Sequence, residues 1–337
     1  MTHKIFNWLD IAEDFSQTLL LGNGASVAVH GEFGYSGLFE AAQVHRFIDA
    51  SVQEVFTKFE TNDFELVLRR LWQAKQVNTA LGIAVKEVDE AYAVVRGALI
   101  KTVQKVHVSY EDAREHFEHI YKFMRRFRTV ISLNYDLIVY WAAQFGNDEL
   151  GSRYHFKDGF NKCVFADDWA MYREAYSGIE NPTIFCYPHG NITLGMTTSL
   201  DERKLVAGSQ DLLNSIIDAW DTGTRSPIFV SDGTSKQKLD AILKSDYLRS
   251  VYGGPLSEVG ESLVIYGWGI AKQEEHILDR IGAATPERIA VSVYDGMQAY
   301  CEHAYRALSD LGVKDIRFFH SDSDGAWNNP VSSTSFV

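Results

Sequence analysis

Seven short apolar runs, each followed at once by a polar or glycine-rich turn, limit the possible folds of this chain more than any other feature. Their apolar residues are continuous instead of alternating, as in strands that a parallel sheet covers on both faces. Segments with helical spacing follow most of the runs. The pattern predicts an α/β fold with a Rossmann-like, doubly wound, mostly parallel sheet. The runs lie at residues 19–21, 129–133, 183–187, 228–230, 263–266, 289–294 and 316–319.

Three segments depart from this alternation of strands and helices. Residues 38–128 contain no proline, and their apolar residues recur at helical spacing, which predicts an insertion of about four helices after the first strand. Residues 147–181 are aromatic and irregular, as in a lid or small subdomain. Residues 326–337 form a tail that we expect to be loosely ordered. The sheet domain then comprises residues 1–37 and 129–325.

Charge and cysteine content limit the partners and the compartment. The chain has 32 Lys and Arg against 45 Asp and Glu, a net charge of −13, which disfavours general nucleic-acid binding. Its three cysteines form no CxxC pair, so a cysteine-rich zinc site is excluded and a cytoplasmic location is expected. No apolar stretch is long enough for a membrane helix, and no membrane association is expected.

The first candidate motif is GNGAS, residues 22–26, which follows the first apolar run. Gly22 and Gly24 would let the backbone approach a ligand, and Ser26 would open a helix whose amides suit a pyrophosphate. The dinucleotide fingerprint is incomplete because residue 27 is Val. A tight turn between strand and helix explains the motif equally well. The candidate cofactor-binding residues here are Gly22, Asn23, Gly24, Ala25 and Ser26.

Two further motifs follow later runs. Asn134 follows the run at 129–133 and could hold a ribose hydroxyl or a water, while Asp136 could bind there or cap the next helix. His189 lies between Pro188 and Gly190, where it could take a proton near neutral pH. A hydrogen-bonded structural role is the alternative for each of these side chains.

The fourth motif, residues 266–277, again places glycines at a crossing from strand to helix. Gly267 and Gly269 permit close approach of the backbone, and Glu274 could reach a ribose hydroxyl or belong to the first turn of a helix. The carboxyl ends of parallel strands meet at one edge of a sheet. All four motifs should therefore gather there.

The order of these motifs resembles the sirtuin-like NAD-binding superfamily, in its bacterial branch that lacks deacetylase features and includes NAD-depleting antiphage effectors. The matching elements are GNGAS at 22–26, LNYD at 133–136, PHG at 188–190 and YGWGIAKQEEHI at 266–277. In the last block Gly269 replaces the usual Ser, and Glu274 the usual Asp. Three scattered cysteines cannot form the zinc ribbon of the deacetylases, so deacetylation is not expected.

The resemblance implies a function at the bond between nicotinamide and ribose. Asn134 would align the ribose and the attacking water, and His189 would act as general base, releasing nicotinamide and ADP-ribose from NAD. NAD would be substrate or ligand, and no metal is expected. Regulation would involve a homo-oligomer or a protein partner at the helical insertion. The alternatives are a sensor that binds NAD or ADP-ribose without turnover, and an interaction scaffold.

Overall fold

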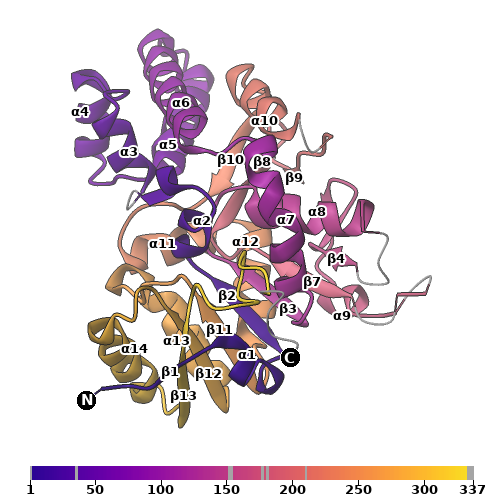
Figure 1. The fold of residues 1–337 in the computed structure, drawn as a ribbon. Helices are drawn as coiled ribbons and strands as arrows, with labels where there is room; N and C mark the ends of the chain where they lie inside the picture. The colour runs from indigo at the N-terminus through magenta and orange to yellow at the C-terminus, as the bar shows by residue number, and fades with distance from the viewer. Residues whose placement is uncertain are drawn as a thin grey trace.

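The computed structural model describes residues 2–34, 37–150, 155–175, 178–179, 182–208 and 211–331, and an eight-stranded sheet forms its centre (Figure 1). All neighbouring strands in this sheet run parallel. In spatial order they are β1 (Ile5–Phe6), β13 (Asp315–His320), β12 (Arg288–Val293), β11 (Ser262–Tyr266), β2 (Thr18–Leu21), β3 (Thr129–Ser132), β7 (Thr183–Cys186) and β4 (Phe156–Lys157). The predicted α/β fold with a mostly parallel, Rossmann-like sheet is confirmed.

The strand order contains one topological switch point, between β2 and β11. From β2 the chain proceeds through β3 and β7 toward one edge, and then returns to β11 and proceeds through β12 and β13 toward the other. Ligands of open α/β sheets bind beyond the carboxyl ends of the strands at such a point. The turns after β2 and β11 carry two of the predicted motifs.

Six of the seven apolar runs became strands of the parallel sheet, and the run at 228–230 is the exception. It belongs to β10 (Arg225–Phe229), which pairs antiparallel with β8 (Gly190–Thr197) in a second, five-stranded sheet. A run of three apolar residues shows burial but not strand direction, so the sequence pattern could not separate the two cases. The remaining strands of this sheet are β9 (Glu202–Lys204), β6 (Val164–Phe165) and β5 (Phe160–Asn161).

The helical insertion contains five helices, where the sequence predicted about four. Asp49, Asp63 and Ser109 cap the first turns of three of them with their side-chain oxygens. Four of the helices gather in a lobe at the top of Figure 1, whereas the fifth packs beside α8 (Ile138–Asp148). The five are α3 (Leu38–Val44), α4 (Ala50–Lys58), α5 (Phe64–Leu81), α6 (Lys86–Val106) and α7 (Tyr110–Met124).

Residues 147–181 contribute to both sheets. Strand β4 extends the parallel sheet, while β5 and β6 join the five-stranded one, next to α9 (Trp169–Tyr172). The described strands of the segment are thus divided between the two sheets. Residues 151–154, 176–177 and 180–181 lie outside the described part. The other helices are α1 (Trp8–Ile11), α2 (Asn23–Val27), α10 (Leu212–Asp221), α11 (Ser235–Ile242), α12 (Asp246–Gly253), α13 (Glu275–Ala284) and α14 (Gln298–Asp310).

The beginning of the C-terminal tail is part of the core. Ala326 and Trp327 are fully buried, and the indole Nε1 of Trp327 donates a hydrogen bond to the carbonyl of Ala25 at 2.8 Å. The expectation of a loosely ordered tail is therefore wrong for these residues, because a buried tryptophan attaches them to α2. Residues 332–337 lie outside the described part of the chain.

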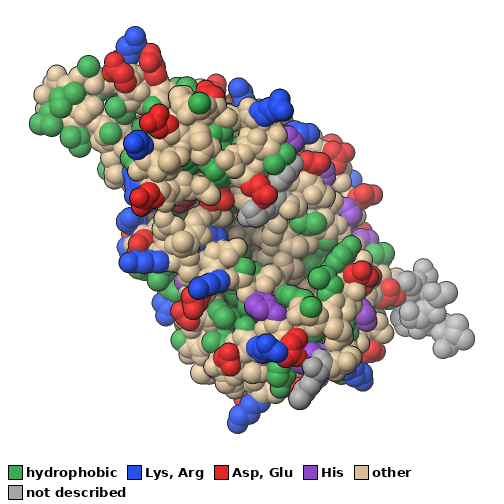
Figure 2. Space-filling view, turned by 90° about the vertical axis from the view of Figure 1, so that its left-hand side faces the viewer, with side chains coloured by type: hydrophobic (Ala, Val, Ile, Leu, Met, Phe, Trp, Pro, Cys, Tyr) green, Lys and Arg blue, Asp and Glu red, His purple; other side chains and the backbone are tan. Residues whose placement is uncertain are grey.

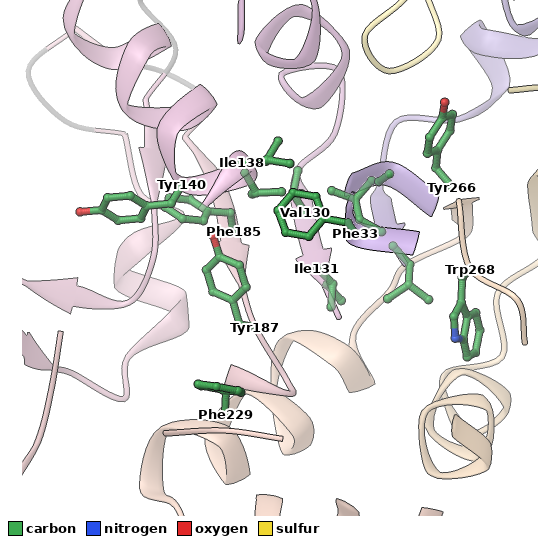
Figure 3. Packing of buried hydrophobic residues seen from close by; sticks show 14 of the residues in the cluster. Phe33, Val130, Ile131, Ile138, Tyr140, Phe185, Tyr187, Phe229, Tyr266 and Trp268 are labelled. Atoms are coloured by element: carbon green, nitrogen blue, oxygen red, sulfur yellow. The ribbon is translucent and has the colours of Figure 1, made fainter. Parts of the chain in front are cut away.

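The core fills both faces of the parallel sheet, since every residue of β2, β3, β7 and β11 is buried. Aromatic side chains surround these strands near their carboxyl ends. Figure 3 shows Val130 and Ile131 of β3 with Tyr140, Phe185 and Tyr187 to one side and Tyr266 and Trp268 to the other. None of the described helices is both long enough and apolar enough to cross a membrane.

A buried histidine joins the insertion to the start of α8. His107 accepts a hydrogen bond from the amide of Leu137 at 3.0 Å through Nε2, and its Nδ1 lies 2.8 Å from the carbonyl of Val108. The ring must be neutral to accept through Nε2. Burial accordingly lowers the pKa of His107 to about 4.

We expect acid to destabilise the protein partly through His107. Between pH 6.5 and 4 the unfolded state binds a proton at this residue and the folded state does not, so stability falls by about 1.4 kcal/mol per pH unit as the pH falls. Urea unfolding of wild type and His107→Gln at several pH values measures this. Other neutral buried histidines contribute equally to the pH dependence of stability in both proteins. The difference between the two pH slopes is therefore the contribution of His107. Equal pH slopes in the two proteins would contradict it.

Candidate functional site

A pocket of about 650 Å³ lies beyond the carboxyl ends of β2, β3 and β11, at the switch point of the sheet. Its volume is within the range of small-molecule and cofactor sites. The helical insertion closes part of its wall, with Thr61 and Val106 among the contributors. None of the described residues of the segment 147–181 lines it, so this described part forms no lid over the pocket. The predicted site residues that line it are Gly22, Asn23, Asn134, Asp136, His189, Gly267, Gly269 and Glu274.

The glycine loops after β2 and β11 cross each other in close contact. The amide of Gly22 donates to the carbonyl of Tyr266 at 2.9 Å, and the amide of Gly24 donates to the carbonyl of Gly267 at 2.7 Å. A Cβ on Gly22 would lie 2.5 Å from the Cα of Trp268. These glycines are therefore required by the crossing of two backbones.

This crossing changes the role expected for GNGAS. The amides of Gly22, Gly24 and Ala25 all donate to protein carbonyls, so these three cannot hold a pyrophosphate as the motif suggested. Ser26 does not open the helix, because α2 already begins at Asn23 with Gly22 as its N-cap. Gly24, Ala25 and Ser26 do not line the pocket. Only the first two residues of the loop, Gly22 and Asn23, form part of the pocket surface, and the other three support it.

Gly190 also lies outside the pocket lining, and it fixes the position of its neighbour His189. Its φ is +78°, and a Cβ there would lie 2.3 Å from the carbonyl oxygen of Ile228. The carbonyl of His189 accepts a hydrogen bond from the amide of Val230 at 2.7 Å. The turn thus places His189 against the end of β10.

Asn134 is held by a network of three side chains. Its Nδ2 donates to the carbonyl of Gly22 at 3.0 Å and to Oγ of Ser26 at 2.7 Å, and Ser26 in turn donates to the carboxylate of Asp136. Both protons of the amide are then used. The group that Asn134 can offer to a ligand is its Oδ1, an acceptor for a ribose hydroxyl or a water proton.

Asp136 completes this network and also binds the first turn of α8. It accepts a hydrogen bond from the amide of Ile138 at 2.9 Å, and its own carbonyl accepts one from Asn191. Burial raises the pKa of Asp136, and the hydrogen bond from Ser26 opposes that rise. Asp136 thus lines the pocket and also holds the first turn of α8.

His189 contacts a second histidine that the sequence did not single out. Its Nε2 lies 2.9 Å from Nε2 of His276 and 3.7 Å from Oε2 of Glu274. Burial lowers the pKa of His189 well below its usual value, the nearby Lys238 lowers it further, and a hydrogen bond with the backbone of Leu133 opposes the shift. Burial likewise lowers the pKa of His276 to about 3. Both imidazoles are thus neutral at pH 7.

Glu274 connects the histidines to Lys238. The ammonium of Lys238 lies 2.5 Å from Oε1 of Glu274, and both side chains are largely buried. The other oxygen, Oε2, is buried and has no hydrogen-bond partner among the described residues. A buried carboxylate oxygen without a donor is uncommon, which points to a group that the pocket could accept there.

Several pocket residues have no counterpart among the predicted site residues. Among them are Tyr135, Asp232 and Lys238, and His276 and Ser235 lie next to the lining without belonging to it. The turn SDGTSK at 231–236, directly after an apolar run, was the available signal for part of this group. Burial raises the pKa of Asp232 to about 6, with a further rise from the neighbouring Asp63.

The comparisons with known proteins give a family but no function. None of the curated proteins matches this chain. The resemblance to the sirtuin-like superfamily is not tested by these comparisons and stays a prediction. A family model described as a domain of unknown function (DUF4917) matches residues 19–327, so the chain belongs to this family.

Proposed function

We propose that the protein binds NAD at the switch-point pocket and hydrolyses its bond between nicotinamide and ribose. One observation carries the proposal. Asn134 and His189, which follow two different strands and were singled out for this chemistry from the sequence, line the same pocket. The two residues are also held close together, because the ring of His189 forms a hydrogen bond with the backbone of Leu133, the residue before Asn134.

Asn134 would orient the ribose and the attacking water. Gly22 and Ser26 accept from its Nδ2, so the Oδ1 side of the amide is fixed in orientation. A fixed acceptor can hold a ribose hydroxyl or a water proton and reduce the entropy lost in reaching the transition state. Nicotinamide leaves as a neutral molecule from a cationic precursor, and its departure needs no acid.

His189 would accept the proton of the water. As the water oxygen bonds to C1′ of the ribose, the C1′–N bond breaks, and its electron pair neutralises the pyridinium nitrogen. The released proton goes to Nε2 of His189, whose pKa burial lowers so that its ring is neutral and can take up a proton. Glu274, 3.7 Å away, then stabilises the imidazolium.

One observation favours binding without turnover, the second function that the sequence left open. Nε2 of His189 is already in contact with Nε2 of His276, and its lowered pKa makes it a weak base. A nucleotide sensor needs the pocket but not this proton transfer. The two functions therefore differ in what loss of His189 does to binding and to turnover.

The proposed location and partners follow from the sequence and the surface. A cytoplasmic location rests on cysteine use, and the three cysteines are free in the structure. On the face in Figure 2, basic and acidic side chains are interspersed, which supports a partner other than nucleic acid. The end of α5 and the turn that follows it expose Leu81 and Ile83, which supports a homo-oligomer or protein partner at the helical insertion.

The proposal is tested by measuring nicotinamide release from NAD with the purified full chain. We expect turnover by wild type and a loss of at least about 100-fold in both Asn134→Ala and His189→Ala, the scale of a general base or of a lost positioning group. Asn134→Asp should also be impaired, because aspartate cannot donate to Gly22 and Ser26. Thermal unfolding of each variant checks that the fold is intact.

His119→Gln serves as the matched control, since this residue does not line the pocket, and it should turn over NAD like wild type. A titration with NAD and ADP-ribose accompanies the assay. Tight binding without nicotinamide release, unchanged in His189→Ala, would support the sensor and contradict hydrolysis. If the protein neither binds NAD or ADP-ribose nor releases nicotinamide, both functions are contradicted.

A further inference from the structure

We propose that His189, His276 and Glu274 form a binding site for a divalent transition-metal ion such as Zn²⁺. Their three potential ligand atoms lie within 4.8 Å of one another. The site departs from the sequence expectation that no metal is needed, which accompanied the hydrolysis of NAD implied by the resemblance. Two neutral imidazoles and one carboxylate are a donor set that zinc uses in sites with an open coordination position.

The distances suit a single ion between the three side chains. Tetrahedral coordination with metal–nitrogen bonds of about 2.05 Å places two ligand nitrogens about 3.3 Å apart. The two Nε2 atoms are 2.9 Å apart, and Oε2 of Glu274 lies 3.7 Å from Nε2 of His189. Shifts of a few tenths of an ångström would bring these two separations to the required value, and the third pair, His276 and Glu274, lies within 4.8 Å.

The polar atoms that would not bind the ion have partners of their own. Oγ of Ser235 lies 3.1 Å from Nδ1 of His276, the Leu133 backbone contacts the ring of His189, and Lys238 binds Oε1 of Glu274. Such outer contacts orient the ligands of metal sites. The atoms left to bind the ion are Nε2 of His189, Nε2 of His276 and Oε2 of Glu274, which has no hydrogen-bond partner among the described residues.

The pocket supplies access and an open position for the ion. His189 and Glu274 line the pocket, whereas His276 lies behind them. Nitrogen donors favour zinc and neighbouring transition metals over Mg²⁺ and Ca²⁺, which prefer oxygen. Lys238 adds a positive charge next to Glu274 and should weaken binding of any cation.

The binding test uses the full chain after treatment with a chelator, titrated with Zn²⁺ by calorimetry and, separately, with Mg²⁺. We expect one Zn²⁺ per chain and little response to Mg²⁺. His276→Gln and Glu274→Gln should each weaken Zn²⁺ binding at least about tenfold, and His119→Gln should not. Lys238→Met should strengthen it. Absence of Zn²⁺ binding, or equal affinity in the two ligand variants and wild type, would overturn the proposal.

A second readout distinguishes lost ligands from lost folding. Zn²⁺ should raise the Tm of wild type and of His119→Gln, but not of the two ligand variants, because an ion that binds only the folded state stabilises it. Ligand variants that unfold cooperatively without Zn²⁺ are folded, and their loss of Zn²⁺ stabilisation is then specific. Zn²⁺ stabilisation of the variants equal to that of wild type would contradict the site.

One consequence rests on the proposed function. A bound ion would occupy Nε2 of His189, the proton acceptor in hydrolysis, so Zn²⁺ should inhibit nicotinamide release and a chelator should restore it. The two proposals fail separately. If chelator-treated protein releases no nicotinamide but binds Zn²⁺, the hydrolase proposal fails and the metal site stands. If it releases nicotinamide but does not bind Zn²⁺, the metal site fails and the hydrolase proposal stands.

Discussion

Gly267→Ala is expected to destabilise the protein by about 3 kcal/mol or more, because the new side chain has no space and the backbone is left-handed there. The φ of Gly267 is +67°, and a Cβ at this position would lie 2.4 Å from the amide nitrogen of Ala25. The contacting atoms are backbone, which cannot move without separating the loops after β2 and β11. Urea unfolding measures the change in free energy.

Gly269→Ala provides the matched comparison for this prediction. Gly269 lies two residues further along the same loop, and a Cβ there would meet no atom within 4 Å. We expect its stability to remain within about 0.5 kcal/mol of wild type. A similar stability loss in both variants would show that the crossing of the two loops is not what requires Gly267.

Trp327→Ala is expected to cost about 3–5 kcal/mol, the range for deletion of a large buried aromatic side chain. Trp327 is 1% exposed, and its ring centroid lies 5.7 Å from that of Tyr266 of β11. Its indole also holds the carbonyl of Ala25 in α2. The variant should therefore loosen the C-terminal segment from α2 and lower the Tm.

Two further variants separate the contributions of Trp327. Trp327→Phe keeps most of the ring contact and loses the hydrogen bond, so we expect a smaller loss, of about 1–2 kcal/mol. Val331→Ala serves as the control because Val331 is half exposed and belongs to the same segment. If Trp327→Ala unfolds at the same urea concentration as Val331→Ala, the segment is not anchored by its tryptophan.

The sequence was informative about the fold where burial is uniform. Strands β2, β3, β7 and β11 are covered on both faces, and their continuous apolar runs show this directly. Burial alone does not determine strand direction, which is why β10 was placed in the wrong sheet. The helical insertion was recognisable because helical spacing is a local property, although the pattern did not give the number of helices.

The site was predictable to the extent that it depends on topology. Asn134 and His189 lie after strands β3 and β7, and the parallel order of these strands brings them to one edge of the sheet. The roles of the glycines were not predictable in the same way. A glycine that approaches a ligand and one that approaches another backbone have the same sequence pattern, and GNGAS proved to be the second kind.

The sequence by itself determined the α/β class, the position of the insertion and the side chains that end up at the switch point, because these follow from local periodicity and from the parallel order of strands. The tertiary structure alone decided that Lys238 of α11 and His276 of α13 join Glu274 and His189 in one buried cluster. His189, Lys238 and the pair Glu274 and His276 come from three distant parts of the chain. Helix packing, which has no short-range signature in the sequence, determines that their side chains meet.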